Sequence, residues 1–374
     1  MRRHPRDTGT CGDAPAGLAP RCLALALFAM VQGGAATPAS AATMESLARS
    51  RFLMGTRLSI EVTAAEPGAA IEAAFTEVQR LDGVLSNWRA DSELVRLNRE
   101  AGRGEVRCSE DLFGAVQAAI DWARRTDGAF DPTIDPLTRW FGLRGPEGRL
   151  PGPGEALSVA PPPRPDPQDR EAAVRLVDWR RVRLHRATRS IRFDAPGMSL
   201  DLGGIGKGQA LDAALRVLRA RGVRSALLDF GGQLLAYGEG PDDGGFRVGV
   251  APPDARNESA VVLRLRDRSL STSGNAERRM PVEQGGAGHL LDPATGAPAG
   301  YQGSVTVMAR QGADADALST ALFVMGPEKG LAWAERHEVD VLFLERDAMG
   351  HLTRRASGAF RSIIKEAGDG STAY

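Results

Sequence analysis

Apolar and polar positions follow two kinds of period along this chain, and the two kinds alternate. Residues 56–62 alternate apolar and polar side chains, which is typical of a half-buried strand, and apolar residues recur at helical spacing over 71–81. The same patterns predict a helix over 109–125, a helix with apolar residues at 211, 215 and 218 after a glycine-rich stretch, and a hairpin between residues 182 and 193. Helices and strands are therefore interleaved, and the sequence predicts a mixed α/β fold.

The C-terminal half continues this mixture. Strands are predicted at 226–230, 246–250, 261–265, 304–309 and 339–344, and helices are predicted from Asp316 and over 331–336. A proline-rich stretch at about 145–168 holds few large apolar residues, so it predicts an exposed irregular loop and not a domain boundary. The pattern therefore predicts a single domain over residues 42–374.

The N-terminal segment is typical of an export signal. Four arginines precede a short apolar run at 22–31, and Ala39-Ser40-Ala41 offers small residues for cleavage before Ala42. The apolar run is shorter than the roughly twenty residues that span a bilayer, so a permanent anchor is not favoured. We expect residues 1–41 to be removed and the mature protein to be exported and periplasmic. Association with the inner membrane and the choice between the Sec and twin-arginine routes stay open.

Charge and cysteine content narrow the possible functions. The chain has 47 Lys and Arg residues against 47 Asp and Glu residues, so it offers no basic excess for nucleic acid, and no nucleic-acid partner is expected. Removal of residues 1–41 would leave Cys108 as the one cysteine, so the mature chain cannot form an internal disulfide. We expect Cys108 to be a buried structural residue.

The strongest candidate for chemistry is the stretch from Asp201 to Asp212, in which four glycines and Lys207 precede a helical pattern. Glycine lets the backbone approach an anion closely, and the first amides of a helix favour negative charge, so the stretch predicts a site for a phosphorylated ligand. It is not a P-loop, because Gly208 follows Lys207 where Ser or Thr is needed. It is not a dinucleotide fingerprint either, because Gln209 stands where the third glycine belongs.

Two polar groups are, taken alone, more typical of turns than of ligand sites. Asp131-Pro132-Thr133 places a carboxylate and a hydroxyl near the aromatic pair Trp140 and Phe141, at the start of a predicted loop. Small polar residues at 271–275 can bind oxyanions, but they also form turns, and we interpret them as a turn.

Two further groups point more clearly to catalysis. His289 follows a glycine-rich loop and precedes Asp292 by three residues, so the loop would deliver an imidazole and a carboxylate together. Asp316 and Thr320 are four residues apart on a predicted helix, so their oxygens share a face and could bind one magnesium ion. The alternative for Asp316 is an acidic helix start, where aspartate is favoured by the helix dipole.

Taken in order, these motifs resemble the ApbE family of FAD:protein FMN transferases. The motifs are Met54-Gly55-Thr56, Trp88 with Ser92 and Asn98, Asp131-Pro132-Thr133, Asp201 to Asp212, Gly231-Gly232, Thr272-Ser273-Gly274, His289 to Gly296, and Asp316 to Thr320. The resemblance implies an ApbE-type flavin transferase fold with two lobes around a flavin cleft. It also implies Mg²⁺-dependent transfer of FMN from FAD to a threonine hydroxyl of an acceptor protein through a phosphoester bond, with release of AMP.

The resemblance also implies roles for individual residues. The residues expected to contact FAD are Met54, Trp88, Ala129, Phe130, Asp131, Asp201, Lys207 and Leu291. The expected Mg²⁺ ligands are the carbonyl of Gly204 and the side chains of Asp316 and Thr320. His289 is expected to take the proton from the acceptor threonine, with Asp292 as the second catalytic residue. The acceptor is expected to carry a threonine flavinylation motif and to belong to an exported or membrane electron-transfer complex.

Two positions depart from the family pattern. Trp88 stands where tyrosine is common, which keeps a stacking surface and loses a hydroxyl. Asp135 stands in place of a usual glycine and adds a negative charge near a site for an anionic ligand. Two alternatives stay open: an FAD pyrophosphatase that gives FMN and AMP, and a flavin-binding maturation factor of the kind found in nitrous oxide reductase systems.

Overall fold

The computed structural model describes residues 43–143, 167–241, 244–255, 257–274 and 288–367. The predicted export signal and most of the predicted proline-rich loop lie outside these residues. None of the helices within the described ranges is both long and apolar enough to cross a membrane.

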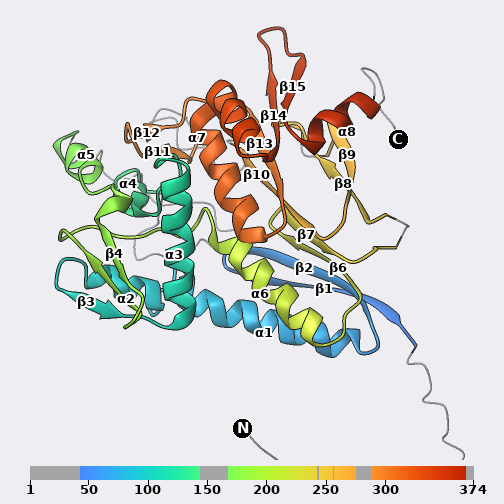
Figure 1. Cartoon of the computed structure of the whole chain (residues 1–374), viewed down its shortest axis with the longest axis horizontal. Helices are drawn as coiled ribbons and strands as arrows, with labels where there is room; N and C mark the ends of the chain where they lie inside the picture. The colour runs from blue at the N-terminus through green and yellow to red at the C-terminus, as the bar shows by residue number, and fades with distance from the viewer. Residues whose placement is uncertain (1–42, 144–166, 242–243, 256, 275–287, 368–374) are drawn as a thin grey trace, which may run out of the picture. The chain divides into compact units, whose positions relative to one another are not determined.

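The described residues contain an eight-stranded antiparallel sheet in the order β1-β2-β6-β7-β10-β13-β14-β15 (Figure 1). Its strands are β1 (Glu45–Leu53), β2 (Thr56–Ala64), β6 (Ser225–Phe230), β7 (Gln233–Tyr237), β10 (Arg268–Gly274), β13 (Ser304–Ala309), β14 (Asp340–Arg346) and β15 (Leu352–Ala356). The predictions for β2, β6, β13 and β14 are confirmed. The other four strands were not predicted.

Side chains alternate between the two faces of this sheet along each strand, and both faces are buried. In β14, Val341 and Phe343 belong to one core, whereas Leu342 and Leu344 belong to the core on the opposite face. The first face is covered by α1 (Pro67–Leu85), α6 (Gly206–Ala220) and α7 (Gly312–Arg336). The second is covered by the hairpin β8 (Phe246–Val250) and β9 (Val261–Leu265) and by α8 (Ala359–Ala367). The predicted bounds of β8 and β9 are confirmed.

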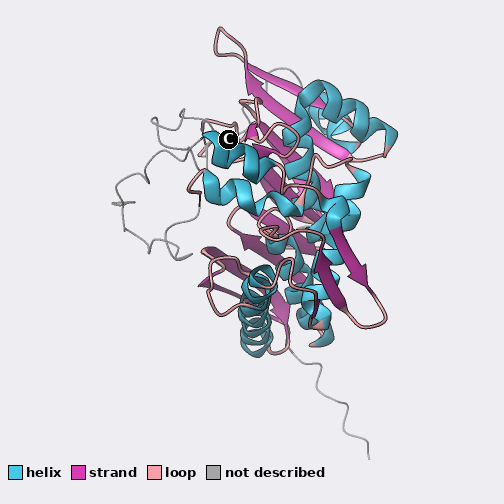
Figure 2. Cartoon of the chain, turned by 90° about the vertical axis from the view of Figure 1, so that its left-hand side faces the viewer, coloured by secondary structure: helices cyan, strands magenta, loops and turns pink. Residues whose placement is uncertain are grey.

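A second lobe packs around α3 (Glu110–Arg125), and Figure 2 views the molecule from its side. Its other elements are α2 (Glu93–Arg99), α4 (Asp135–Trp140), α5 (Pro167–Val174) and the sheet of β3 (Glu105–Arg107), β5 (Ser190–Phe193) and β4 (Val182–His185). The core of this lobe also contains Ala317 and Ala321 of α7, so α7 packs against both lobes. The prediction that Cys108 is buried is confirmed, and burial raises the pKa of its thiol to about 11.

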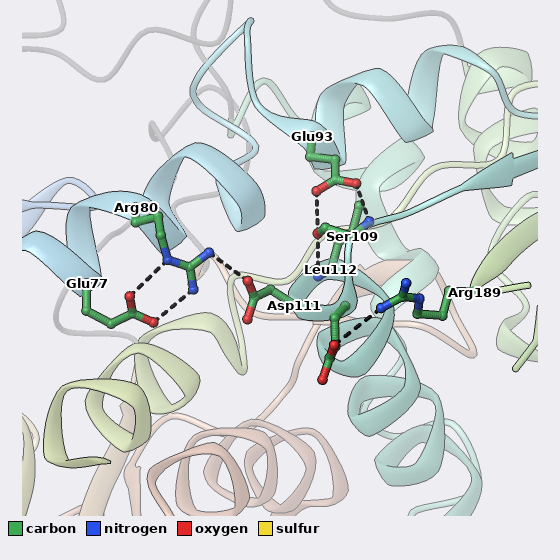
Figure 3. Close-up of polar contacts among 8 residues, drawn as sticks. Glu77, Arg80, Glu93, Ser109, Asp111, Leu112 and Arg189 are labelled. Atoms are coloured by element: carbon green, nitrogen blue, oxygen red, sulfur yellow. Dashed lines mark hydrogen bonds and ion pairs between the residues drawn. The ribbon is translucent and has the colours of Figure 1, made fainter. Parts of the chain in front are cut away.

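Side-chain hydrogen bonds fix the start of α3, where the sequence predicts a helix from Ser109. The Ser109 hydroxyl accepts a hydrogen bond from the amide of Leu112, as an N-cap does, and the Glu93 carboxylate of α2 accepts from the amide and hydroxyl of Ser109 (Figure 3). Arg80 of α1 donates to Asp111 in the first turn of α3. One helix start therefore ties three helices together.

Two local predictions are wrong, and a third is confirmed as helix with different bounds. The chain after Phe130 does not form an open loop: it forms a 3₁₀ turn at Pro132–Ile134 and then α4, because prolines occupy the first turn of each. Of the turn predicted at 271–275, residues 271–274 instead form part of β10, because they pair with β13, and residue 275 lies outside the described residues. The predicted helix from Asp316 begins at Gly312, and it continues through the helix predicted over 331–336 across a kink at Gly326.

Candidate functional site

A cavity of about 370 Å³ opens where the two lobes meet, which is within the usual range for small-molecule sites. All the residues predicted to bind flavin or cation line it, together with His289: Met54, Trp88, Ala129, Phe130, Asp131, Asp201, Gly204, Lys207, His289, Leu291, Asp316 and Thr320. Asp292 is not among the lining residues. The structure therefore brings together six separate segments of the chain in one cavity.

Two tight hairpin turns form one wall. Met54 and Gly55 join β1 to β2 with φ of 45° and 78°, and Gly231 and Gly232 join β6 to β7 with φ of 60° and 90°. Both two-residue turns thus have the positive φ values of type I′ hairpins. A Cβ on Gly231 would lie 2.7 Å from the Thr56 hydroxyl, so only glycine fits there. Met54 is held in a conformation that non-glycine residues rarely adopt, at the position where it faces the cavity.

Asn98 fixes the backbone at the entrance to the glycine-rich stretch. Its amide nitrogen donates to the Leu200 carbonyl at 2.9 Å, and its oxygen accepts from the Leu200 amide at 2.8 Å. Ser92 caps α2 by accepting from the amide of Val95. Of the three residues in this predicted motif, only the half-buried Trp88 lines the cavity, and the other two support the backbone around it.

Asp131 lines the cavity, but its carboxylate accepts hydrogen bonds from neighbouring protein groups. The carboxylate accepts from the Thr133 amide at 2.8 Å, the Thr133 hydroxyl at 2.6 Å and the Trp179 amide at 3.1 Å. Burial raises the pKa of Asp131 although these bonds lower it. The adjacent Pro132 carbonyl accepts from the amide of Asp201 at 2.7 Å, so this loop and the glycine-rich stretch form a continuous wall.

The departure at Asp135 has a local explanation. Its carboxylate is fully buried and lies 2.8 Å from Arg139 Nε, one turn later on α4. Asp135 is not a lining residue of the cavity, and the arginine offsets its charge. Asp135 therefore acts within α4, and its charge is not presented to a ligand in the cavity.

Lys207 and Asp316 form the polar centre of the cavity. Lys207 Nζ lies 3.1 Å from Asp316 Oδ1, and the amide of Gly208 donates to Asp316 Oδ2 at 3.1 Å. Gly204 lies against Thr320, because a Cβ on Gly204 would be 3.1 Å from the Thr320 hydroxyl. The glycine-rich stretch and the start of α7 are more than a hundred positions apart, and the fold joins them here.

These residues fit a magnesium ion. Asp316 has a carboxylate whose side chain is only 5% exposed, and the Thr320 hydroxyl and the backbone of Gly204, which has a carbonyl to offer, lie against each other. The Lys207 ammonium lies next to the Asp316 carboxylate, so this carboxylate pairs with a positive charge. The described residues contain no group of three or more His, Cys, Asp or Glu that could hold a metal. One carboxylate with neutral oxygens is the sparse protein set that Mg²⁺ accepts when substrate phosphates and water complete its shell.

His289 and Asp292 have different surroundings. His289 is half-buried and lines the cavity just before the hairpin of β11 (Leu291–Asp292) and β12 (Ala297–Pro298). The Asp292 carboxylate accepts from the Ala294 amide at 2.9 Å and the Thr295 hydroxyl at 3.0 Å. These bonds close the β11–β12 turn, so Asp292 shapes the segment next to His289.

The sequence did not assign the hydroxyl groups of β10 to the site. Ser271 and Ser273 line the cavity, and their hydroxyls lie 3.2 Å and 2.9 Å from the buried Ser319 hydroxyl. Ser319 in turn donates to the Asp316 carbonyl at 3.0 Å. The i, i+2 spacing of the two serines is the signal that could have placed both on one face of a strand.

Comparisons with known proteins agree with this arrangement. The model of the ApbE family matches residues 54–343. An FAD:protein FMN transferase from Treponema pallidum (strain Nichols) is 32% identical over 326 residues, which cover 82% of this chain and 86% of the relative. One from Klebsiella pneumoniae (strain 342) is 30% identical over 301 residues, covering 80% and 89%. The crystal structure of the ApbE protein from Thermotoga maritima superposes with a TM-score of 0.74 at 26% identity, over 85% of this chain and 99% of that one.

The family match contains both hairpin turns, the glycine-rich stretch, His289 and the start of α7. The expected mixed fold with two lobes around a cleft is confirmed by the structure and by this superposition. The chain therefore belongs to the ApbE family.

Proposed function

We propose that this protein transfers FMN from FAD to a threonine hydroxyl of an acceptor protein, with Mg²⁺ and with release of AMP. The observation that carries the proposal is the polar centre of the cavity, where Lys207 and Asp316 lie beside Gly204 and Thr320. A phosphorylated ligand and a divalent cation are the partners that this combination of a lysine, a carboxylate and a glycine-rich helix start would bind. The FAD:protein FMN transferase names of the relatives support the choice of FAD and FMN.

The cavity divides naturally into an aromatic part and a polar part. Trp88 and Phe130 offer ring faces on which a flavin or adenine can stack. The Lys207 ammonium, which is about one-third exposed, can turn from Asp316 to a diphosphate oxygen. Mg²⁺ held by Asp316, Thr320 and the Gly204 carbonyl would offset the charge of the diphosphate and of the leaving AMP.

The proposed transfer is a single displacement at phosphorus. The acceptor hydroxyl oxygen bonds to the phosphorus of the FMN half, and the bond from that phosphorus to the bridging oxygen breaks, so AMP leaves with the electron pair. The imidazole of His289 takes the hydroxyl proton. Positioning of the reactants and stabilisation of charge are the main contributions of a protein to such chemistry.

The test uses a peptide that contains a threonine flavinylation motif, incubated with the protein, FAD and Mg²⁺. We expect the intact mass of the peptide to rise by one FMN less one water, with equimolar AMP. Asp316→Ala should abolish the gain, whereas Asp314→Ala should retain it, because Asp314 bonds the Trp122 indole and does not line the cavity. His289→Ala should slow transfer by about 10²-fold or more. His351→Ala, which removes an exposed histidine, is its control.

The same assay separates the alternatives. Free FMN and AMP with two unmodified acceptor peptides would replace the transferase by a pyrophosphatase. Flavin binding without cleavage would instead support a carrier role in maturation of another enzyme. Activity that persists in Asp316→Ala, or that survives chelation of Mg²⁺, would contradict the cation site.

We further propose that the protein works in the periplasm. The support is the sequence of residues 1–41, with its arginines, its short apolar run and its small residues before Ala42. The acceptor would then be an exported domain of a membrane electron-transfer complex.

A further inference from the structure

The first turn of α7 is held by a carboxylate from another helix. The first amides of a helix have no partners within it, and the residue before α7, Gln311, makes no side-chain bond to them. Asp212 of α6 bonds them instead: it accepts from the Gly312 amide at 2.7 Å and from the Ala313 amide at 3.0 Å. One side chain thus caps α7 and ties it to the neighbouring α6 (Figure 1).

The two helices meet through bare backbone at this point. A Cβ on Gly208 would lie 2.1 Å from the Gly312 carbonyl oxygen, and a Cβ on Gly312 would lie 2.6 Å from the Gly208 oxygen. The Gln233 side-chain amide also donates to the Gly312 carbonyl at 2.9 Å. Contacts this close fix the position of the first turn of α7, since neither backbone can move toward the other.

This tie lies about one helical turn from the polar centre on both helices. Asp316 follows Gly312 by four residues, and Lys207 precedes Asp212 by five. Asp212 does not line the cavity, so its effect on a ligand there must pass through the position of Asp316. Movement of the first turn of α7 along α6 would change the 3.1 Å separation of Lys207 and Asp316 directly.

We propose that Asp212 is a positioning residue for the cation site: by holding the first turn of α7 on α6, it sets where the Asp316 carboxylate meets Lys207 and Gly204. The identity of the cation rests on the proposed function. Burial of this carboxylate costs free energy, because desolvation outweighs its two amide bonds and raises its pKa to about 6. A serine or asparagine next to α7 would cap a helix without that cost.

The experiment measures metal binding directly. Mn²⁺ is titrated into the wild-type protein with saturating FAD, and free Mn²⁺ is followed by electron paramagnetic resonance. Asp212→Asn keeps one acceptor oxygen but turns an NH₂ group toward the second amide. We expect it to weaken Mn²⁺ binding about tenfold or more, as loss of a group that orients a metal ligand does. The affinity for FAD without metal, measured by flavin fluorescence, is expected to change less.

The matched control is Ser109→Ala, which removes the N-cap of α3 at a residue that does not line the cavity and makes no bond to α6 or α7 within the described part of the chain. It should lower the urea midpoint and leave Mn²⁺ affinity within about twofold of wild type. Equal weakening by both variants, or unchanged affinity in Asp212→Asn, would overturn the role of Asp212. A wild-type protein that binds no Mn²⁺ would contradict the proposed cation site and, with it, this role. If Asp212→Asn does not fold, Asp212→Ser replaces it with the same expected result.

Discussion

Three aspartates in or near the cavity wall accept hydrogen bonds from different kinds of donor, and the donors give each carboxylate a different role. Asp131 receives the amide and hydroxyl of Thr133 in its own loop and the amide of the more distant Trp179, and so shapes one wall of the cavity. Asp212 receives two backbone amides of a different helix and joins two elements. Asp316 receives one backbone amide and the Lys207 ammonium, so it alone meets a mobile charge that a ligand can displace. The residue type is the same in all three, and the identity of the donor decides the role.

The raised pKa of Asp212 predicts how stability depends on pH. Between about pH 4 and 6 the folded protein binds a proton at Asp212 that the unfolded chain has released, so this contribution to the free energy of unfolding falls as pH rises. A pKa of about 6, against the usual 3.8 of an aspartate, corresponds to at most about 3 kcal/mol. The nearby Asp314 raises this pKa further and Arg216 lowers it.

The measurement compares urea unfolding of wild type and Asp212→Asn at several pH values from 4 to 7.5. Other titrating groups are common to both proteins, so the difference between the two free energies isolates position 212. We expect wild type to lose stability relative to the variant as pH rises. A difference that stays constant or grows with pH would show that the Asp212 carboxylate is not destabilised by burial.

At the scale of the element, α7 runs from Gly312 to Arg336, but its helical backbone is interrupted at Gly326. Gly326 has φ of 72° and ψ of 173°, a region that essentially only glycine occupies, and Pro327 follows it. No atom lies within 4 Å of a Cβ placed on Gly326, so a side chain there would meet no obstacle. The kink is therefore set by backbone conformation.

This distinction can be tested by two glycine-to-alanine changes. Gly326→Ala should lower the free energy of unfolding by about 1–3 kcal/mol through backbone strain. Gly83→Ala, within α1 and also without neighbours within 4 Å, should raise it by about 0.5–1 kcal/mol. Urea unfolding monitored by circular dichroism measures both. Stabilisation by Gly326→Ala would contradict the assigned conformation.

The elements that could be predicted from sequence are those in which the spacing of apolar residues follows the buried positions. The strands β8, β9 and β13 match their predicted bounds because apolar residues dominate or alternate in each. β1 was missed because it is an edge strand with mostly exposed side chains. β10 was interpreted as a turn because Ser, Thr and Gly favour turns, and its pairing with β7 and β13 is a tertiary effect.

The site divides in the same way. The helix-start position of Lys207 and the shared helix face of Asp316 and Thr320 follow from local spacing, so both could be predicted. Their meeting could not, because 109 positions separate Lys207 from Asp316 and only the packing of α6 on α7 joins them. The role of Asp212 was hidden for the same reason, since its two donors lie a hundred positions further along the chain.

At the scale of the whole molecule, α7 links the cavity to both lobes. Ala317 and Ala321 pack into the core around α3, whereas Leu318 and Leu322 pack into the core beneath the sheet. The helix that carries Asp316 is therefore buried on two sides, and loss of packing in either lobe would disturb the position of Asp316. A ligand that bridges the lobes should stabilise the whole fold by mass action.

The proposed export of the protein, with removal of residues 1–41, can also be tested at this scale. Cleavage after Ala41 would leave the sheet complete, because its edge strand β1 begins at Glu45. In a Gram-negative host, we expect the periplasmic fraction to contain a chain that starts at Ala42, as shown by intact mass and N-terminal sequencing. Ala41→Arg places a large charged residue at the cleavage position and should leave the precursor uncut. A chain without residues 2–41 should stay in the cytoplasm and unfold at the same temperature as the processed protein, because β1 is intact in both. Periplasmic protein that retains all of residues 1–41 would contradict cleavage, and protein confined to the cytoplasm would contradict export itself.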